Sequence, residues 1–135
     1  MKQIDIYKEY VDILPDNVDV EDLSKLTRDK NHVFLQFNFS EYELPDQGFK
    51  IHISVNLFNY QKILNIIFAF CRSKRITFKY ISNYSILEKN VAGKSQDTFS
   101  GKFITIYPNT FNCFKKYIED LYKCEQLKTK SSMFI

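Results

Sequence analysis

The sequence predicts a single small α+β domain, with a mixed β-sheet and helices packed on one face. Stretches in which every second residue is apolar, as in half-buried strands, alternate with stretches of helical apolar spacing. The chain has 135 residues and is 44% hydrophobic, enough for one core and too little for two ordinary domains. No internal repeat and no glycine-rich phosphate loop breaks this pattern.

Residues 1–43 are expected to form an N-terminal segment with one strand, ahead of a core that spans residues 44–135. The stretch DVEDLSKLTRDKN, residues 19–31, offers at most one short acidic helix. Residues 32–42, HVFLQFNFSEY, follow the alternation of a half-buried strand, with these residues on its apolar face: Val33, Leu35, Phe37 and Phe39. A proline, an aspartate and a glycine then turn the chain.

Residues 49–55 are predicted to form the next strand, and its polar face is unusual. Alternation places Ile51 and Ile53 on the apolar face. The same alternation places Lys50 and His52 together on the opposite face. A cation and a titratable imidazole therefore share one side of the sheet.

A helix is predicted between this strand and the next. Asn56 is a suitable N-cap, and apolar residues at helical spacing continue to about Ser73, so this helix should cover the sheet. Residues 76–81, ITFKYI, form the third predicted strand. Because a strand, a helix and a strand in succession usually make a right-handed crossover, the two strands should be parallel neighbours, with Lys79 beside His52.

The remainder continues the alternation of elements. A short helix over residues 83–89 leads through a polar loop into a strand over residues 102–107, KFITIY. Strict alternation would put Lys102 and Tyr107 on opposite faces of that strand. Asn109 should cap a final helix. The last residues, SSMFI, resemble a strand cut short, so we expect the sequence to be part of a larger protein.

Composition argues against several classes of function. The net charge of +3 is too small and too dispersed for a nucleic-acid surface. No signal peptide and no membrane-spanning apolar run is found, which predicts a cytoplasmic protein without a membrane partner. The three cysteines, Cys71, Cys113 and Cys124, lack CxxC spacing, so neither a metal site nor a disulfide is expected.

Lys50, His52 and Lys79 together suggest a chemistry. On one sheet face they would supply a cation for a carbonyl oxygen, a general acid and an amine base. An α-proton next to an amide is very weakly acidic, so its removal needs both the cation and a neutral amine, a form that burial and a neighbouring like charge favour. Taken singly, the two lysines are also typical of solvated strand residues, and His52 of a structural histidine.

The motifs GFKIHIS (48–54), ITFKYI (76–81) and SGKFITIYP (100–108) resemble the N-terminal lyase domain of class III lanthipeptide synthetases. These synthetases join a phosphoserine/phosphothreonine lyase domain to kinase-like and cyclase-like domains in one chain. The lyase domain is similar to the phosphothreonine lyases of bacterial pathogens. The resemblance, which covers roughly residues 44–135, implies a precursor peptide with a leader and a phosphorylated core as the partner, and no cofactor.

The resemblance also implies roles for individual residues. Lys79 would remove the α-proton, and His52 would protonate the departing phosphate. Lys50 would hydrogen-bond the substrate carbonyl and stabilise the enolate-like charge. Tyr107 and Lys102 would add hydrogen bonds to the phosphate or to the base.

The phosphate site is where this chain departs from the family pattern. The family usually has an arginine shortly before SGKF, where this chain has Gln96, Asp97 and Thr98, so Lys94 is the nearby cation expected to bind phosphate. Further arginines follow a segment like SSMFI in the family. The alternative interpretation is a non-catalytic domain that binds the leader peptide or docks on the kinase-like domain. Its 13 Phe, 9 Tyr and a free sheet edge would suit peptide capture by strand addition.

Overall fold

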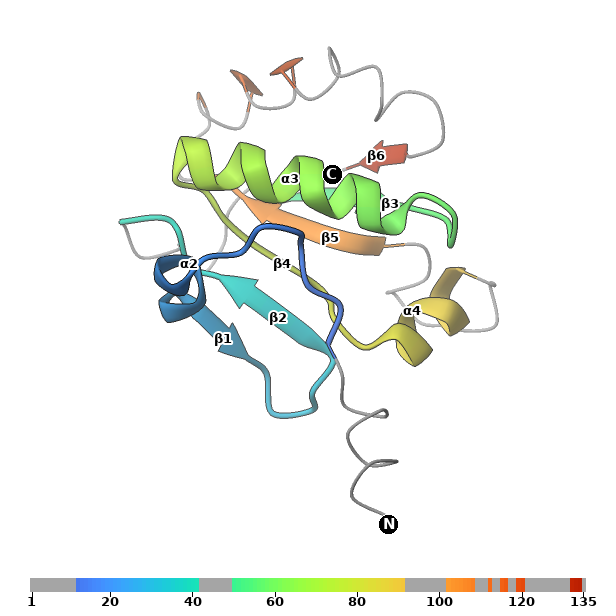
Figure 1. The fold of residues 1–135 in the computed structure, drawn as a ribbon. Coiled ribbons are helices and arrows are strands. Elements are labelled where there is room, and N and C mark those ends of the chain that lie inside the picture. Colours follow the sequence, from blue (N-terminus) through green and yellow to red (C-terminus); the bar gives the residue numbers. More distant parts are fainter. Residues whose placement is uncertain are drawn as a thin grey trace.

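The computed structural model describes residues 12–41, 50–91 and 102–108, together with 112, 115–116, 119–120 and 132–134. The elements in chain order are α2 (Val20–Ser24), β1 (Leu26–Arg28), β2 (Phe34–Phe37), β3 (Ile51–Ser54), α3 (Tyr60–Lys74), β4 (Thr77–Ile81), α4 (Tyr84–Val91), β5 (Lys102–Tyr107) and β6 (Ser132–Phe134). Figure 1 shows that these helices and strands pack together as one body. The predicted α+β class is confirmed.

The six described strands form one sheet in the order β1-β2-β4-β5-β3-β6. Each pair of neighbours among them is antiparallel. The prediction of a mixed sheet is therefore wrong for these strands. It rested on the assumption that β3 and β4, which a helix connects, are hydrogen-bonded to each other.

The crossover through α3 predicted the direction of the two strands and not their adjacency. Both β3 and β4 are antiparallel to β5, so they run the same way, with β5 between them. Adjacent strands lie about 4.8 Å apart, which separates β3 from β4 by about 10 Å. A crossover helix spans either distance, and the sequence alone therefore did not reveal the inserted strand.

The core lies between α3 and one face of the sheet (Figure 1). The buried side chains of α3 are Ile63, Leu64, Ile67, Phe68 and Cys71. On the sheet, these predicted apolar positions are confirmed as buried: Leu35, Phe37, Phe39, Ile51 and Ile53. Val33 is only partly buried, and Ile76, Phe78 and Tyr80 are buried as well. The ring of Phe37 joins the two layers, with its centroid 5.1 Å from that of Phe68 and 5.5 Å from that of Phe78.

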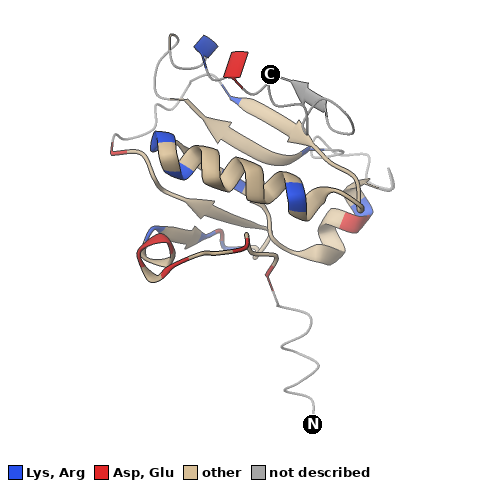
Figure 2. Ribbon diagram, turned by 45° about the horizontal axis from the view of Figure 1, so that its top comes forward, with Lys and Arg blue, Asp and Glu red and all other residues tan. Residues whose placement is uncertain are grey.

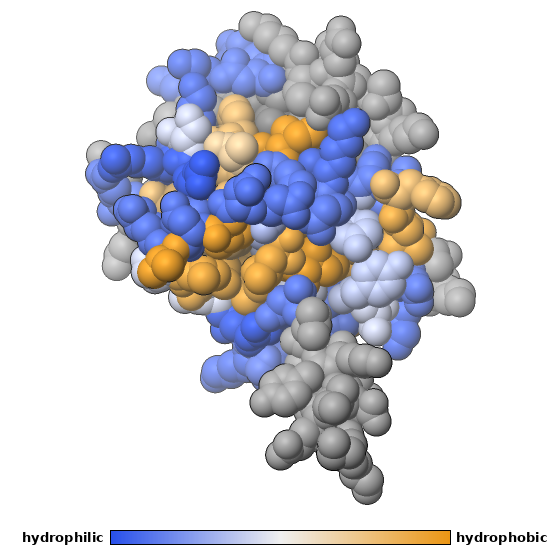
Figure 3. All heavy atoms as spheres, in the orientation of Figure 1, coloured by the Kyte–Doolittle hydropathy of each residue, from blue (hydrophilic) through white to orange (hydrophobic). Residues whose placement is uncertain are grey.

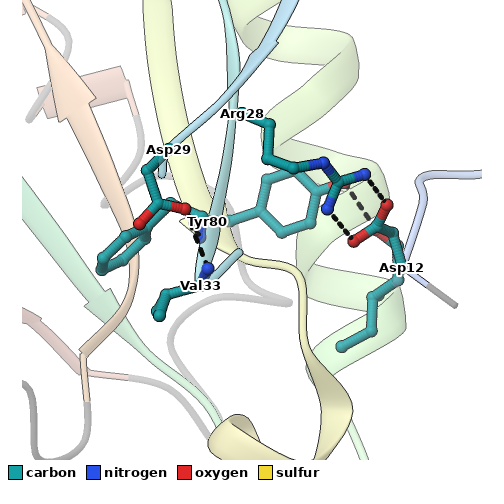
Figure 4. Close-up of polar contacts among 7 residues, drawn as sticks. Asp12, Arg28, Asp29, Val33 and Tyr80 are labelled. Carbon is teal, nitrogen blue, oxygen red and sulfur yellow. Dashed lines mark hydrogen bonds and ion pairs between the residues drawn. The ribbon is translucent and has the colours of Figure 1, made fainter. Parts of the chain in front are cut away.

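The N-terminal residues contribute a strand that the sequence pattern did not predict. β1 pairs with β2 and extends the sheet. Its Arg28 forms a bidentate ion pair with Asp12, and the Tyr80 hydroxyl donates a 2.6 Å hydrogen bond to the Ile13 carbonyl (Figure 4). Residues 12–41 are thus built into the same sheet as the predicted core.

The predicted helices are present with shifted ends. The short acidic helix is confirmed as α2, which Asp19 caps. Asn56 does not cap α3 directly, because its side chain accepts hydrogen bonds from the N–H groups of Phe58 and Asn59 in a preceding turn. The helix itself begins at Tyr60. The predicted helix over 83–89 is confirmed as α4.

Predictions for the last third of the chain fall partly within the described residues. Helical backbone at 112, 115–116 and 119–120 agrees with the predicted final helix. The strand predicted in SSMFI is confirmed as β6, whose backbone pairs with β3. Cys71 is buried, whereas Cys113 and Cys124 lie outside the described residues.

Among the described residues, acidic and basic residues are found in several parts of the fold (Figure 2). Acidic residues occur in α2 and in the segment before it, and lysines and arginines occur towards both ends of α3 (Figure 2). The side that carries α3 shows both hydrophilic and hydrophobic side chains (Figure 3), and Phe58 is 98% exposed. Among the described residues, no helix has the length and apolar character needed to cross a membrane.

Candidate active site

The sheet face opposite α3 carries a row of side chains that crosses four strands. Gln36 of β2 pairs with Lys79 of β4, Lys79 pairs with Thr105 of β5, and Thr105 pairs with His52 of β3. Directly paired residues point to the same face, so these four side chains form one line. Lys79 and His52 therefore lie on either side of Thr105 on the same face of the sheet. Their backbones are separated by two strand spacings, or about 10 Å.

A β-bulge in β5 decides which of its residues reach this face. The register shifts between Ile53 and Ser54, which pair with Ile104 and Lys102 and leave Phe103 unpaired. The extra residue adds its own side chain to the core and leaves Lys102 on the polar face. The prediction that the two ends of β5 face opposite sides is therefore wrong, because both line the same cavity.

A cavity of about 140 Å³ opens over this row. Its described lining residues are Phe34, Lys50, His52, Lys79, Lys102, Thr105 and Tyr107. They include three lysines and one histidine, and no carboxylate. A cavity with this charge attracts an anionic group, and its ammonium and imidazole N–H groups can donate charge-assisted hydrogen bonds to phosphate oxygens.

Two aromatic rings lie against the lysines. The Lys79 Nζ atom is 4.5 Å from the centroid of the Phe34 ring and 6.0 Å from that of Tyr107. The Lys50 Nζ atom is 5.8 Å from the Tyr107 centroid. Because the face of an aromatic ring attracts an ammonium group, these contacts position both lysines at the cavity.

The hydroxyl group of Tyr107 has a shifted pKa. Burial raises its pKa above the ordinary value of 10.0, and the charge of Lys50 opposes this effect in part. The phenol is therefore neutral throughout the physiological pH range. In that form its O–H can donate a hydrogen bond to an anion in the cavity.

The surroundings of His52 favour its neutral imidazole form in the free site. Its Nδ1 atom lies 3.2 Å from the Thr105 Oγ1 atom. Burial lowers the pKa of His52 below its ordinary value of 6.5, and the charges of Lys102, Lys50 and Lys79 lower it further. An anion bound among the lysines would offset their charge and favour the imidazolium form.

The structure brings together five of the six residues expected at the site. Lys50, His52, Lys79, Lys102 and Tyr107 all line the one cavity. β5 and its bulge bring this about, since β5 carries two of them and separates the strands that carry the others. The sixth, Lys94, and the neighbouring departures at 96–98 lie outside the described residues.

Sequence reasoning missed two lining residues, Phe34 and Thr105. Phe34 did leave a signal, because it is a large aromatic residue at a position where the alternation of β2 calls for a polar side chain. Thr105 left none. Its contact with His52 depends on the pairing of β5 with β3, which no local pattern specifies.

Residues 16–130, most of the chain, match the family described as RamC, N-terminal domain. The chain belongs to this family. The RamC N-terminal match begins ahead of α2 and takes in both β1 and β2, so it extends beyond the predicted core of residues 44–135.

A curated relative supports the same assignment. The chain is 30% identical over 82 residues to the probable SapB synthase of Streptomyces coelicolor. The match covers 61% of this chain and 9% of the synthase, so the chain corresponds to a small part of that protein. Together, the two matches confirm the resemblance to the N-terminal domain of class III lanthipeptide synthetases.

Proposed function

We propose that this RamC N-terminal domain is a lyase that eliminates phosphate from phosphoserine or phosphothreonine in a precursor peptide during lanthipeptide biosynthesis. One observation carries the proposal. A cavity lined by Lys50, His52, Lys79, Lys102 and Tyr107 has no carboxylate among its described lining residues, so it suits a phosphorylated side chain. The family assignment and the similarity to a SapB synthase support a role in lanthipeptide biosynthesis.

In the proposed reaction the amine of Lys79 takes the Cα proton of the phosphorylated residue. The electron pair of that C–H bond forms the Cα=Cβ double bond, and the Cβ–O bond breaks with its electrons on the phosphate. His52 gives a proton to the leaving phosphate, and Lys50 stabilises the charge that develops on the carbonyl oxygen. The products are dehydroalanine or dehydrobutyrine and inorganic phosphate.

The electrostatic surroundings of His52 suit a proton donor that becomes protonated when the substrate binds. In the free site the lysines disfavour the imidazolium, and the pKa of His52 is lowered. The phosphate of the substrate offsets those charges, so binding itself promotes the acid form that the leaving group needs. Lys102 and Tyr107 supply hydrogen bonds to the phosphate in this proposal.

The partners belong to the same proposal. The peptide would arrive already phosphorylated, from a kinase-like domain of the same chain, and pass on to a cyclase-like domain. The reaction would take place in the cytoplasm. The lyase step uses only side chains of this domain, and no metal or organic cofactor is part of the proposed step.

The experiment that tests the function is mass spectrometry of a phosphoserine peptide from the cognate precursor, incubated with the 135-residue chain and with the full-length protein. Loss of phosphoric acid is the expected result. Lys79→Ala should slow it by a factor of about 100 or more, the usual contribution of a general base. Lys62→Ala, a lysine on the exposed side of α3, is the matched control. A parent rate in Lys79→Ala would exclude the proposed role of Lys79.

The alternative is a non-catalytic domain that captures the leader peptide or docks on the kinase-like domain. β1 forms one edge of the described sheet and pairs only with β2 there, which leaves an edge for strand addition. The same assay separates the two functions. No loss of phosphoric acid with either protein, together with a leader affinity that falls on substitution in β1, would favour the docking domain.

A further inference from the structure

A second cavity adjoins the cationic one and shares a wall with it. Its volume is about 240 Å³. Its lining residues are Asp29, Asn31, Val33, Phe34, Ile81, Ile86 and Asn90. Phe34 lines both cavities, with Lys79 over its ring on the cationic side. Unlike its neighbour, this cavity has no cation among its described lining residues.

The two cavities are spaced as the side chains of an extended peptide are. Lys79 lines the first and Ile81 the second, and they lie two residues apart on β4 and so on the same face. Two residues of a strand span about 6.6 Å. In an extended peptide, side chains two positions apart also point the same way at that spacing.

We propose that the second cavity is a specificity subsite that receives an apolar side chain of the substrate peptide, two residues from the phosphorylated residue. This inference rests on the proposed function and adds to it the class of peptide. Val33, Phe34, Ile81 and Ile86 supply the apolar surface that such a side chain would cover. The amide of the exposed Asn31 offers hydrogen bonds to the peptide backbone at the rim.

Asp29 gives the subsite the opposite charge preference to the cationic cavity. Its Oδ1 atom accepts 2.8 Å hydrogen bonds from the N–H groups of Val33 and Phe34; Figure 4 shows the bond to Val33. Burial opposes ionisation of Asp29, but these hydrogen bonds, with that from Asn31, outweigh it and lower the pKa of the carboxyl group. The carboxylate would repel an acidic side chain, so the subsite discriminates against Asp, Glu and a second phosphate.

The test uses peptides in which a phosphonate, with carbon in place of the bridging oxygen, prevents elimination. Leu, Ala or Glu is placed two residues before or after the phosphonate residue, and affinity for the full chain is measured by fluorescence anisotropy. On one side of the phosphonate, Leu should bind about fivefold to tenfold more tightly than Ala, from partial burial of its side chain. Glu should bind more weakly than Ala. Equal affinities for the three peptides on both sides would overturn the proposal without any variant.

Two variants locate the preference. Ile86→Ala should abolish most of the difference between Leu and Ala, and Asp29→Asn should remove the penalty for Glu. Ile66→Ala is the matched control, because it is the same residue, also partly buried against the core, on α3 across the sheet. The Leu preference should survive in it. A Leu preference that is unchanged in Ile86→Ala would place the subsite elsewhere and overturn the inference.

The outcomes also separate this inference from the proposed function. Binding that requires the phosphonate and ignores the flanking residue would leave the lyase proposal intact and remove the subsite. The opposite result is also possible: the peptides could bind equally well with and without the phosphonate and still show a Leu preference that Ile86→Ala abolishes. That result would support an apolar subsite and contradict the phosphate site.

Discussion

At the scale of single residues, the site depends on charges of one sign held close together. Lys50, Lys79 and Lys102 surround His52 and, after burial, account for its lowered pKa. The folded protein therefore binds a proton at His52 less tightly than the unfolded chain does. Acidification below about pH 6.5 consequently destabilises the fold through this residue.

Lys102→Met should raise the pKa of His52, because Lys102 is the largest of the charges that depress it. The pKa should stay below its ordinary value, since burial, the leading cause, is unchanged. NMR titration of the imidazole C–H signal, assigned with a His52→Gln variant, measures the shift. Lys62→Met on the exposed side of α3 is the control and should have no effect. A pKa of His52 that is the same in Lys102→Met as in the parent would show that Lys102 does not act on it.

Sulfate should bind more tightly as the pH falls. A dianion among the lysines favours the imidazolium of His52, and by linkage the protonated site binds the dianion better. The gain should begin as the pH falls through the pKa of the sulfate-bound imidazole, and it should level off below the lowered pKa of His52 in the free site. Affinity should rise by up to about tenfold for each pKa unit gained on binding. Calorimetric titration from pH 8 to 5 measures it, and sulfate keeps its charge over that range.

His52→Gln provides the comparison for that measurement. It keeps a hydrogen-bonding side chain of similar size and removes the titration, so the affinity for sulfate should become nearly independent of pH. The same pH dependence in the variant and the parent would assign the effect to another group.

At the scale of elements, α3 and β5 have separate tasks. α3 covers the apolar face of the sheet with side chains that are entirely buried. β5 lies in the middle of the sheet; ordinary alternation puts Tyr107 on the polar face beside Thr105, and the bulge adds Lys102 to that face. Stability therefore depends mainly on one face of the sheet and the proposed chemistry on the other, with β5 common to both.

Substitution on the buried side of α3 should destabilise the protein without altering the site. Ile67→Ala removes a side chain with 0% exposure and should cost about 2–5 kcal/mol of unfolding free energy, from lost burial and the cavity left behind. Ile66→Ala, at the next and partly buried position, should cost clearly less. Urea denaturation measures both. Equal losses would mean that α3 packs on the sheet through a different face.

At the scale of the whole molecule, the N-terminal residues belong to the fold. β1 and β2 extend the sheet beyond β4, and Phe37 and Phe39 of this segment stack in the core. The boundary predicted at residue 44 would cut through this sheet and leave the edge of β4 unpaired. The RamC N-terminal match, which begins at residue 16, agrees with the more extended unit.

A fragment of residues 44–135 should therefore fail to fold cooperatively. It loses the buried side chains of β2 and the 2.6 Å hydrogen bond between Tyr80 and Ile13. Thermal melting followed by circular dichroism, with the 135-residue chain as reference, tests this expectation. A cooperative transition with the same midpoint as the full chain would show that residues 44–135 form an independent domain.

The sequence by itself determined which side chains share a face and which class of fold they build. Lys50 and His52 had to lie on the same face because side chains alternate along any strand. The helical spacing of the apolar residues in α3 gave that helix one apolar face, which had to pack against another element. Such patterns are local, and they do not depend on which strands become neighbours. The family resemblance rests on the same local motifs.

Only the tertiary structure decided how the strands meet. It placed β5 between β3 and β4, and it left Phe103 without a partner on β3, in a bulge. It also brought Phe34 of β2 against Lys79. Strand order and register follow from the packing of side chains that are distant in sequence, and a shift of one residue moves a side chain to the other face. For that reason the sequence predicted the composition of the site better than its geometry.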